Sequence, residues 1–356
     1  MIGFRHALIT VDWEPELVER LVDGLCAERH TVCSHSDRRT IRAALDTADV
    51  AVLGGTAGTH AATSSTLRWL HIDAAGIDSS ATAALFTGRT VTCSSGRNAP
   101  AIADQAVWLL LSLVHRSRVV EQLHRRRAWS ARALRDMASL NGGRAVIIGA
   151  GATAIELAPR LRAMGLHPTA IARHERSTSE PFDRIVASAD RRTLLDELSN
   201  ADAVVLAASL NDATHHLIDD EAIERLPRHA RLVNVGRGAL VDQRALARAL
   251  HDGSIAGAGL AVADPEPLPP WPPLWRSPNT LVVPHAAPRV ADRDERALDS
   301  ILRTAEALRG GTPPAGSLSP DDVYTLGADP QRLAVLASRA WIRTSGRTVR
   351  AGQPVR

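Results

Sequence analysis

One strand–glycine–helix segment constrains the fold of this 356-residue chain more than any other feature. The apolar run Ala145–Ile148 is typical of a buried parallel strand, and Gly149-Ala150-Gly151-Ala152-Thr153-Ala154 follows it and opens a helix. A G-x-G-x-x-G/A pattern is weak evidence alone, but here it lies between a strand and a helix, which is the context that the pattern requires. Gly149 permits a tight turn, Gly151 lets a pyrophosphate approach the backbone, and Ala154 allows close packing of the helix on the sheet. The segment therefore predicts a doubly wound α/β domain that holds a dinucleotide at a helix N-terminus.

Short apolar runs alternate with helical segments in the rest of the chain, which indicates parallel sheets. In the first hundred residues the pattern predicts these elements: strands at Ala7–Val11, Val50–Gly54, Leu67–Asp73 and Thr90–Cys93, and a helix over Glu14–Arg29. A long apolar helix follows from about Ala101 to Arg118, and it carries apolar groups around nearly its whole circumference. Such a helix is expected to be buried between domains or subunits.

Composition excludes several classes of protein. The chain is 45% hydrophobic and 23% charged, with a formal net charge of only +3, and its arginine clusters at 124–127 and 343–356 are interpreted as solvated, so we expect no nucleic-acid partner. We find no apolar run of membrane-spanning length and no secretory pattern at the start, and therefore expect a cytoplasmic protein with no membrane partner. The three cysteines have neither metal-ligand spacing nor an even count, so we expect reduced thiols and no metal site.

Three ionisable residues each follow an apolar run that is typical of a buried strand. These residues are Arg237, Glu266 and His285, and the stretch that contains them runs from Asn234 to His285. The carboxyl ends of parallel strands are where open α/β sheets bind ligands. Taken singly, each residue is explained as well by a loop charge, a turn or a strand end, but the three together favour a functional site.

The order of arginine, then Glu-Pro, then Pro-His resembles the D-isomer-specific 2-hydroxyacid dehydrogenases, and the resemblance covers about residues 45–324. The Ala103-Asp104 pair is closest to the glyoxylate and hydroxypyruvate reductase branch. The resemblance implies a Rossmann cofactor domain inserted into a flavodoxin-like substrate domain. The implied segments are as follows: residues 1–98 and 289–325 for the substrate domain, 99–288 for the dinucleotide-binding domain, and 326–356 for a short helix and a disordered basic tail.

The resemblance also assigns roles in the reduction of a 2-oxo acid to a D-2-hydroxy acid. Hydride transfer to a ketone builds negative charge on oxygen, which an acid must protonate and a cation must stabilise. His285 is expected to be the acid, Glu266 to hold its ring and favour the imidazolium, and Arg237 to bind the substrate carboxylate and polarise the carbonyl. Backbone N–H groups at Ala75 and Gly76 are expected to receive the same carboxylate, although a plain strand-to-helix turn is the alternative there.

Cofactor recognition in the resembled family involves three further groups of residues. The expected contacts are Gly149, Gly151, Ala152 and Thr153; Arg173, His174 and Arg176; and Val235 and Gly236. The strand end that usually carries an acidic residue for NAD has Ala172 followed by Arg173, and this suits a 2′-phosphate because guanidinium binds phosphate through two hydrogen bonds. We therefore expect NADPH in preference to NADH; the alternative is that Arg173 and Arg176 are solvated loop charges.

One departure from the family keeps other functions open. Ala261 stands where the family usually has an aspartate that bonds the nicotinamide carboxamide. Two alternatives therefore remain beside a small 2-oxo acid substrate: the same chemistry on a bulky or phosphonate-bearing 2-oxo acid, and a non-catalytic nucleotide-sensing interaction protein. The resemblance further implies a homodimer through the cofactor domain, with the region around Trp129 at its interface.

Overall fold

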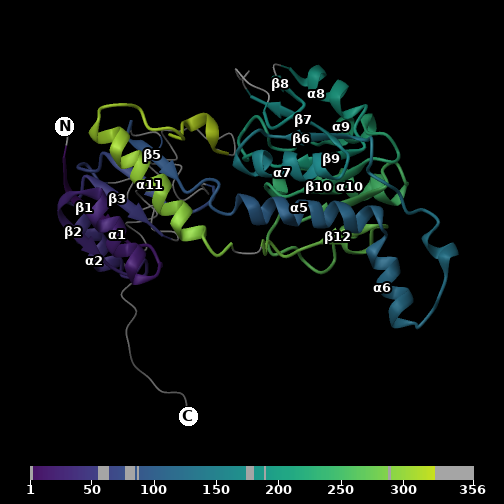
Figure 1. The fold of residues 1–356 in the computed structure, drawn as a ribbon, viewed down its shortest axis with the longest axis horizontal. Helices are drawn as coiled ribbons and strands as arrows, with labels where there is room; N and C mark the ends of the chain where they lie inside the picture. Colours follow the sequence, from purple (N-terminus) through teal and green to yellow (C-terminus); the bar gives the residue numbers. More distant parts are fainter. Residues whose placement is uncertain are drawn as a thin grey trace, which may run out of the picture. The chain divides into compact units, whose positions relative to one another are not determined.

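The computed structural model describes residues 3–54, 64–76, 85, 88–173, 180–187, 190–287 and 290–324. The described chain forms two compact units, one up to Arg97 and again from Asp292, the other from Asn98 to Ala291. Each unit has its own parallel sheet (Figure 1). Each also has its own hydrophobic core. The predicted fold class, two doubly wound parallel-sheet domains with one inserted into the other, is confirmed.

The first unit contains a five-stranded parallel sheet in the order β2-β1-β3-β4-β5. This is the flavodoxin-like order, with the switch point between β1 and β3. Its strands are β1 (Phe4–Ile9), β2 (Ala27–Val32), β3 (Val50–Leu53), β4 (Trp69–Ile72) and β5 (Thr90–Cys93). Its helices are α1 (Pro15–Leu25), α2 (Arg38–Leu45), α11 (Arg293–Arg309) and the short η4 (Pro320–Asp322).

The helix predicted over Glu14–Arg29 is wrong at its C-terminal end. It ends at Leu25 because Cys26 adopts a left-handed conformation with φ 50°, and β2 begins at Ala27. β2 pairs in parallel with β1, with Ala27 opposite Phe4. β2 is an edge strand without a buried residue, so it lacks the apolar run by which the central strands could be predicted.

The second unit contains a seven-stranded parallel sheet in the order β12-β11-β10-β9-β6-β7-β8. Counted from β6, the first six strands have the Rossmann order 3-2-1-4-5-6, and β12 is added at the edge. The strands are β6 (Arg144–Ile148), β7 (His167–Ala172), β8 (Arg184–Ala187), β9 (Ala203–Leu206), β10 (Arg231–Asn234), β11 (Gly257–Leu260) and β12 (Thr280–Val282). The helices are α5 (Ala99–Val114), α6 (Ser117–Arg125), α7 (Ala152–Ala163), α8 (Arg191–Leu198), α9 (Asp220–Arg225), α10 (Gln243–His251) and the short η1 (Ala131–Leu134), η2 (Gly238–Leu240) and η3 (Pro273–Arg276).

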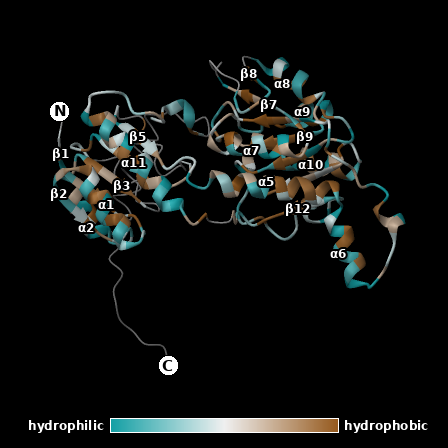
Figure 2. Ribbon diagram, viewed as in Figure 1, coloured by the Kyte–Doolittle hydropathy of each residue, from teal (hydrophilic) through white to brown (hydrophobic). Residues whose placement is uncertain are grey.

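Central strands of this second sheet are buried on both faces, and β9 shows how. Val204 and Leu206 belong to one core cluster, whereas Ala203 and Val205 belong to the other, because successive side chains point to opposite faces. Apolar residues accordingly predominate along the sheet in Figure 2. Burying a side chain of the size of valine or leucine contributes about 1.5–3 kcal/mol, so the two faces together hold the strand ends in place.

Two features are absent from the described residues. No helix in this part of the chain is long and apolar enough to cross a membrane. The same residues contain no group of three or more His, Cys, Asp or Glu side chains that could hold a metal ion.

Candidate active site

The turn between β6 and α7 accepts only glycine at its first position. Gly149 has φ +100°, and a Cβ there would lie 2.9 Å from the backbone oxygen of Ala207 and the nitrogen of Ala208. Its own N–H donates to the carbonyl of Ile171 in β7 at 2.8 Å. The turn is therefore fixed against β7 and the end of β9, and any side chain would displace it.

The second glycine of the pattern, Gly151, is explained differently from Gly149. Gly151 is the N-cap of α7 and has φ −79°, and no atom beyond the neighbouring residues of the chain lies within 4 Å of where its Cβ would be. The protein itself therefore does not require glycine at this position, and the start of α7 presents backbone N–H groups beside open space. Ala152 and Thr153 are the first residues of the helix, and Ala154 is completely buried against the core. This arrangement fits a pyrophosphate, which helix N-termini bind through free N–H groups.

The end of β7 carries the predicted determinants of cofactor choice. Ala172 is the last residue of the strand and is 9% exposed, and Arg173 follows it in an exposed position. The structure thus places an uncharged residue and then an arginine at the strand end. His174 and Arg176 lie outside the described residues.

Arg237 lies in a loop that its neighbours hold closely. The side chain of Asn234, which is 1% exposed, accepts from the N–H of Gly236 at 3.0 Å and donates to the carbonyl of Arg237 at 2.9 Å. A Cβ on Gly236 would lie 2.8 Å from the oxygen of Ala208, and one on Gly238 would collide with the backbone of Ala263. Val235, in the same loop, is 8% exposed. This packing leaves little freedom to the backbone that carries the half-buried guanidinium.

Glu266 and His285 form a hydrogen-bonded pair. The Nδ1 atom of His285 lies 2.7 Å from Oε2 of Glu266, and the other carboxylate oxygen accepts from the N–H of Ala263 at 2.9 Å. Since a carboxylate accepts hydrogen bonds, Nδ1 carries a proton, and Nε2 is the ring nitrogen that can deliver a second one. The side chains are 51% and 36% exposed for His285 and Glu266, so the pair is accessible to a small molecule.

Sheet topology brings the three residues to one edge. Arg237, Glu266 and His285 follow β10, β11 and β12, which are neighbours in register in the sheet. The backbone of Ala263 joins the first two loops, because it packs against Gly238 and donates to Glu266. Ala261, by contrast, is 4% exposed and packs in the core, so no side-chain oxygen is present there.

The predicted carboxylate loop belongs to the first unit. Ala75 and Gly76 follow β4, and Ala75 is exposed whereas Gly76 is half-buried. Sequence reasoning missed two polar residues, each of which directly precedes a loop that carries candidate site residues. Asn234 begins the Arg237 loop and could have been noticed from its position in that run, whereas the contacts of Asp73, directly before Ala74, had no local signal.

Comparisons with known proteins show the family to which the chain belongs. The profile of the NAD-binding domain of D-isomer specific 2-hydroxyacid dehydrogenases matches residues 107–287. The chain is 32% identical over 232 residues to a glyoxylate reductase of Korarchaeum cryptofilum, an alignment that covers 64% of this chain and 68% of that protein. It is 32% identical over 201 residues to an uncharacterised protein of Corynebacterium melassecola, covering 54% of this chain and 62% of that protein.

A similar solved structure is a D-isomer specific 2-hydroxyacid dehydrogenase from Xanthobacter autotrophicus in complex with NADPH and MES. Its TM-score is 0.71 at 20% identity, with 93% of this chain and 100% of that chain covered. At this identity the likeness establishes the fold.

Proposed function

Because the chain belongs to the D-isomer specific 2-hydroxyacid dehydrogenase family, a family of NAD(P)-dependent oxidoreductases, we propose that it reduces a small 2-oxo acid to the D-2-hydroxy acid. The substrate class that we propose is that of glyoxylate and hydroxypyruvate, and NADPH is the preferred reductant. The observation that carries this proposal is the hydrogen bond of 2.7 Å between His285 and Glu266, on loops adjacent to the one that holds Arg237.

His285 acts as the general acid in this proposal. A bound nicotinamide supplies the hydride, and the oxygen of the former ketone then needs a proton. Glu266 orients the imidazole through Nδ1, so Nε2 is left to protonate that oxygen. The backbone N–H of Ala263 fixes the carboxylate and thereby the direction of the ring.

Arg237 binds the carboxylate of the 2-oxo acid and polarises its carbonyl. Guanidinium suits both tasks because its donors form a planar fork and its charge persists at all physiological pH values. Backbone N–H groups at Ala75 and Gly76 serve the same carboxylate. Since a carboxylate and an adjacent carbonyl define the 2-oxo acids, these groups recognise the class of substrate, and they leave its side chain unspecified.

Support for NADPH comes from the end of β7. Ala172 provides no carboxylate to bind a ribose 2′-hydroxyl, and Arg173 follows it with a cation for a 2′-phosphate. We assign the phosphate contacts to Gly149, Gly151, Ala152 and Thr153 at the start of α7, and further cofactor contacts to Val235 and Gly236. The similar structure from Xanthobacter autotrophicus contains NADPH, which agrees with this choice.

We further propose a homodimer formed through the second unit. In α6, which the structure describes in full, no residue is buried, although its apolar residues gather on one side. Large apolar side chains of the same region are also exposed: Trp108 51%, Val120 43%, Trp129 102% and Met137 39%. Each of these large apolar side chains is exposed to water, and a second copy of the chain packed on this part of the second unit would cover them.

The experiment that tests the proposed function is an initial-rate assay with the wild-type protein. NADPH and NADH are compared over glyoxylate, hydroxypyruvate, pyruvate and larger 2-oxo acids, and the configuration of each product is determined. We expect turnover with NADPH on a small 2-oxo acid and a D product. Binding of the nucleotide without turnover of any 2-oxo acid would overturn the proposal and favour a sensor.

A further inference from the structure

A buried carboxylate lies directly before the loop that we propose to receive the substrate carboxylate. Asp73 is the residue that links β4 to Ala74-Ala75-Gly76, and its side chain is only 7% exposed. A buried charge is costly unless hydrogen bonds and an opposite charge compensate for it. The contacts of Asp73 therefore show what holds the start of this loop.

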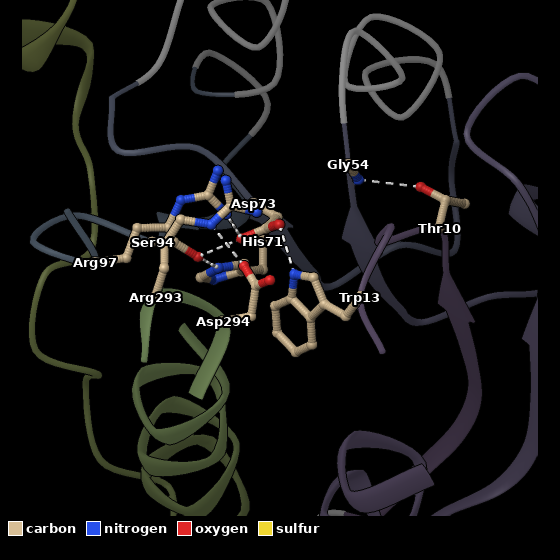
Figure 3. Close-up of polar contacts among 9 residues, drawn as sticks. All are labelled: Thr10, Trp13, Gly54, His71, Asp73, Ser94, Arg97, Arg293 and Asp294. Carbon is tan, nitrogen blue, oxygen red and sulfur yellow. Dashed lines mark hydrogen bonds and ion pairs between the residues drawn. The ribbon is translucent and has the colours of Figure 1, made fainter. Parts of the chain in front are cut away.

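Three donors from two other segments converge on Asp73 (Figure 3). The indole Nε1 of Trp13, between β1 and α1, donates to Oδ2 at 2.9 Å. The hydroxyl of Ser94, just after β5, donates to Oδ1 at 2.9 Å, and Arg97 pairs with the same oxygen. These contacts cross 60, 21 and 24 positions of sequence, so Asp73 connects the carboxyl ends of β1, β4 and β5.

A chain of hydrogen bonds extends from Asp73 into the sheet. Nε2 of His71 lies 2.9 Å from the Ser94 hydroxyl, its Nδ1 lies 2.8 Å from the Thr92 hydroxyl, and the indole of Trp69 donates to Thr92 at 2.9 Å. Indole is only a donor and carboxylate is only an acceptor, so the two ends fix the direction of every bond between them. Thr92 donates to Nδ1 of His71, and Nε2–H of His71 donates to Ser94.

The direction of these hydrogen bonds requires a neutral His71 with its proton on Nε2. His71 is completely buried, and burial lowers its pKa to about 4, with nearby Arg97 acting in the same direction and Asp73 opposing both. A neutral ring satisfies both hydrogen bonds of His71, the one with Thr92 and the one with Ser94. Ser94 is thus held so that its hydroxyl proton points at Asp73.

We propose that Asp73 is a positioning residue, which fixes the Ala74–Gly76 loop in the geometry that receives the carboxylate of the 2-oxo acid. This inference rests on the proposed function and adds to it the group that orders the substrate loop. Asp73 directly precedes the loop in the chain and is not proposed to touch the substrate. Its effect is on affinity for the 2-oxo acid, whereas the hydride and proton transfers depend on the second unit.

The test compares Asp73→Asn with a matched control in the same sheet. Asp49 is also a buried carboxylate of the first unit, 8% exposed, and accepts from the backbone N–H groups of Arg5 and His6. It directly precedes β3, however, and therefore lies at the amino end of its strand, whereas Asp73 lies at the carboxyl end of β4. Asp73→Asn is expected to raise KM for the 2-oxo acid about 10- to 100-fold, as a misplaced substrate contact does, with little change in kcat and in NADPH affinity. Asp49→Asn is expected to lower the melting temperature with KM unchanged.

Two milder variants keep the test decisive if Asp73→Asn does not fold. Trp13→Phe removes one donor and retains a ring, and Ser94→Ala removes the link to His71. Each is expected to raise KM less than Asp73→Asn does. Unchanged KM in all variants, with active wild-type protein, would overturn the role of Asp73 alone. A wild-type protein that turns over no 2-oxo acid would overturn the proposed function, and this inference with it.

Discussion

Acidification should destabilise the first unit through His71. Its pKa is lowered from the usual 6.5 to about 4, chiefly by burial. The unfolded chain therefore binds a proton between these two pH values where the folded chain does not. The stability that a neutral His71 provides is complete above pH 6.5 and is lost as the pH falls towards about 4.

The size of this loss of stability follows from how far the pKa of His71 is lowered. A displacement of about 2.5 pH units corresponds to about 3 kcal/mol in total, of which about 2 kcal/mol is already lost at pH 5. Burial also lowers the pKa of His6 and of His215, so the whole protein loses more stability than His71 alone explains. A His71→Gln variant separates the contributions because glutamine does not titrate.

Urea unfolding at pH 7.5 and at pH 5 measures the change in the free energy of unfolding of the first unit. The two units need separate probes, so we would follow methyl signals of Val52 and Leu70, which lie in the first sheet. The wild-type first unit should lose about 2 kcal/mol more than His71→Gln between these pH values. Equal losses in both proteins, or a His71 ring that titrates near pH 6.5 in the native NMR spectrum, would show that burial does not keep His71 neutral in this pH range.

Three further predictions concern the second unit. Gly151→Ala should fold normally because no atom beyond the neighbouring residues of the chain lies within 4 Å of the new methyl group. It should nevertheless weaken NADPH binding about tenfold or more by calorimetry, because the methyl group occupies the proposed phosphate space. Unchanged affinity would place the phosphates elsewhere. Arg173→Ala should raise KM for NADPH about 10- to 100-fold and leave KM for NADH nearly unchanged, and equal effects on both would contradict a 2′-phosphate contact. Val120→Asp should convert a dimer into monomers in sedimentation, and a wild-type protein that sediments as a monomer would exclude the proposed interface.

Sequence periodicity predicted the parts of the fold that depend on burial. Central strands such as β9 are buried on both faces and stand out as apolar runs. The edge strands β2 and β8 are largely exposed or half-buried and carry no such run, so the pattern missed them. The helix before β2 was extended too far because its end depends on the left-handed conformation of Cys26, for which the residue type gives no signal.

The part of the candidate site that could be predicted consists of residues that follow the ends of strands. Arg237, Glu266 and His285 were placed after three apolar runs, and the neighbouring order of β10, β11 and β12 then accounts for their shared edge. The network around Asp73 could not be predicted, because it joins residues up to 60 positions apart whose types are common in loops. Contacts of this kind depend on tertiary structure and have no periodic signal.

The most direct test of the account is the rate of a single turnover by His285→Gln. Glutamine can still contact Glu266 but cannot supply a proton, so NADPH oxidation by the 2-oxo acid on which the wild-type protein is most active should slow by about 100- to 10,000-fold. NADPH affinity, measured separately, should not change. A variant that turns over as fast as the wild type would contradict the assignment of His285 as the acid, and with it the proposed use of the Glu266–His285 pair.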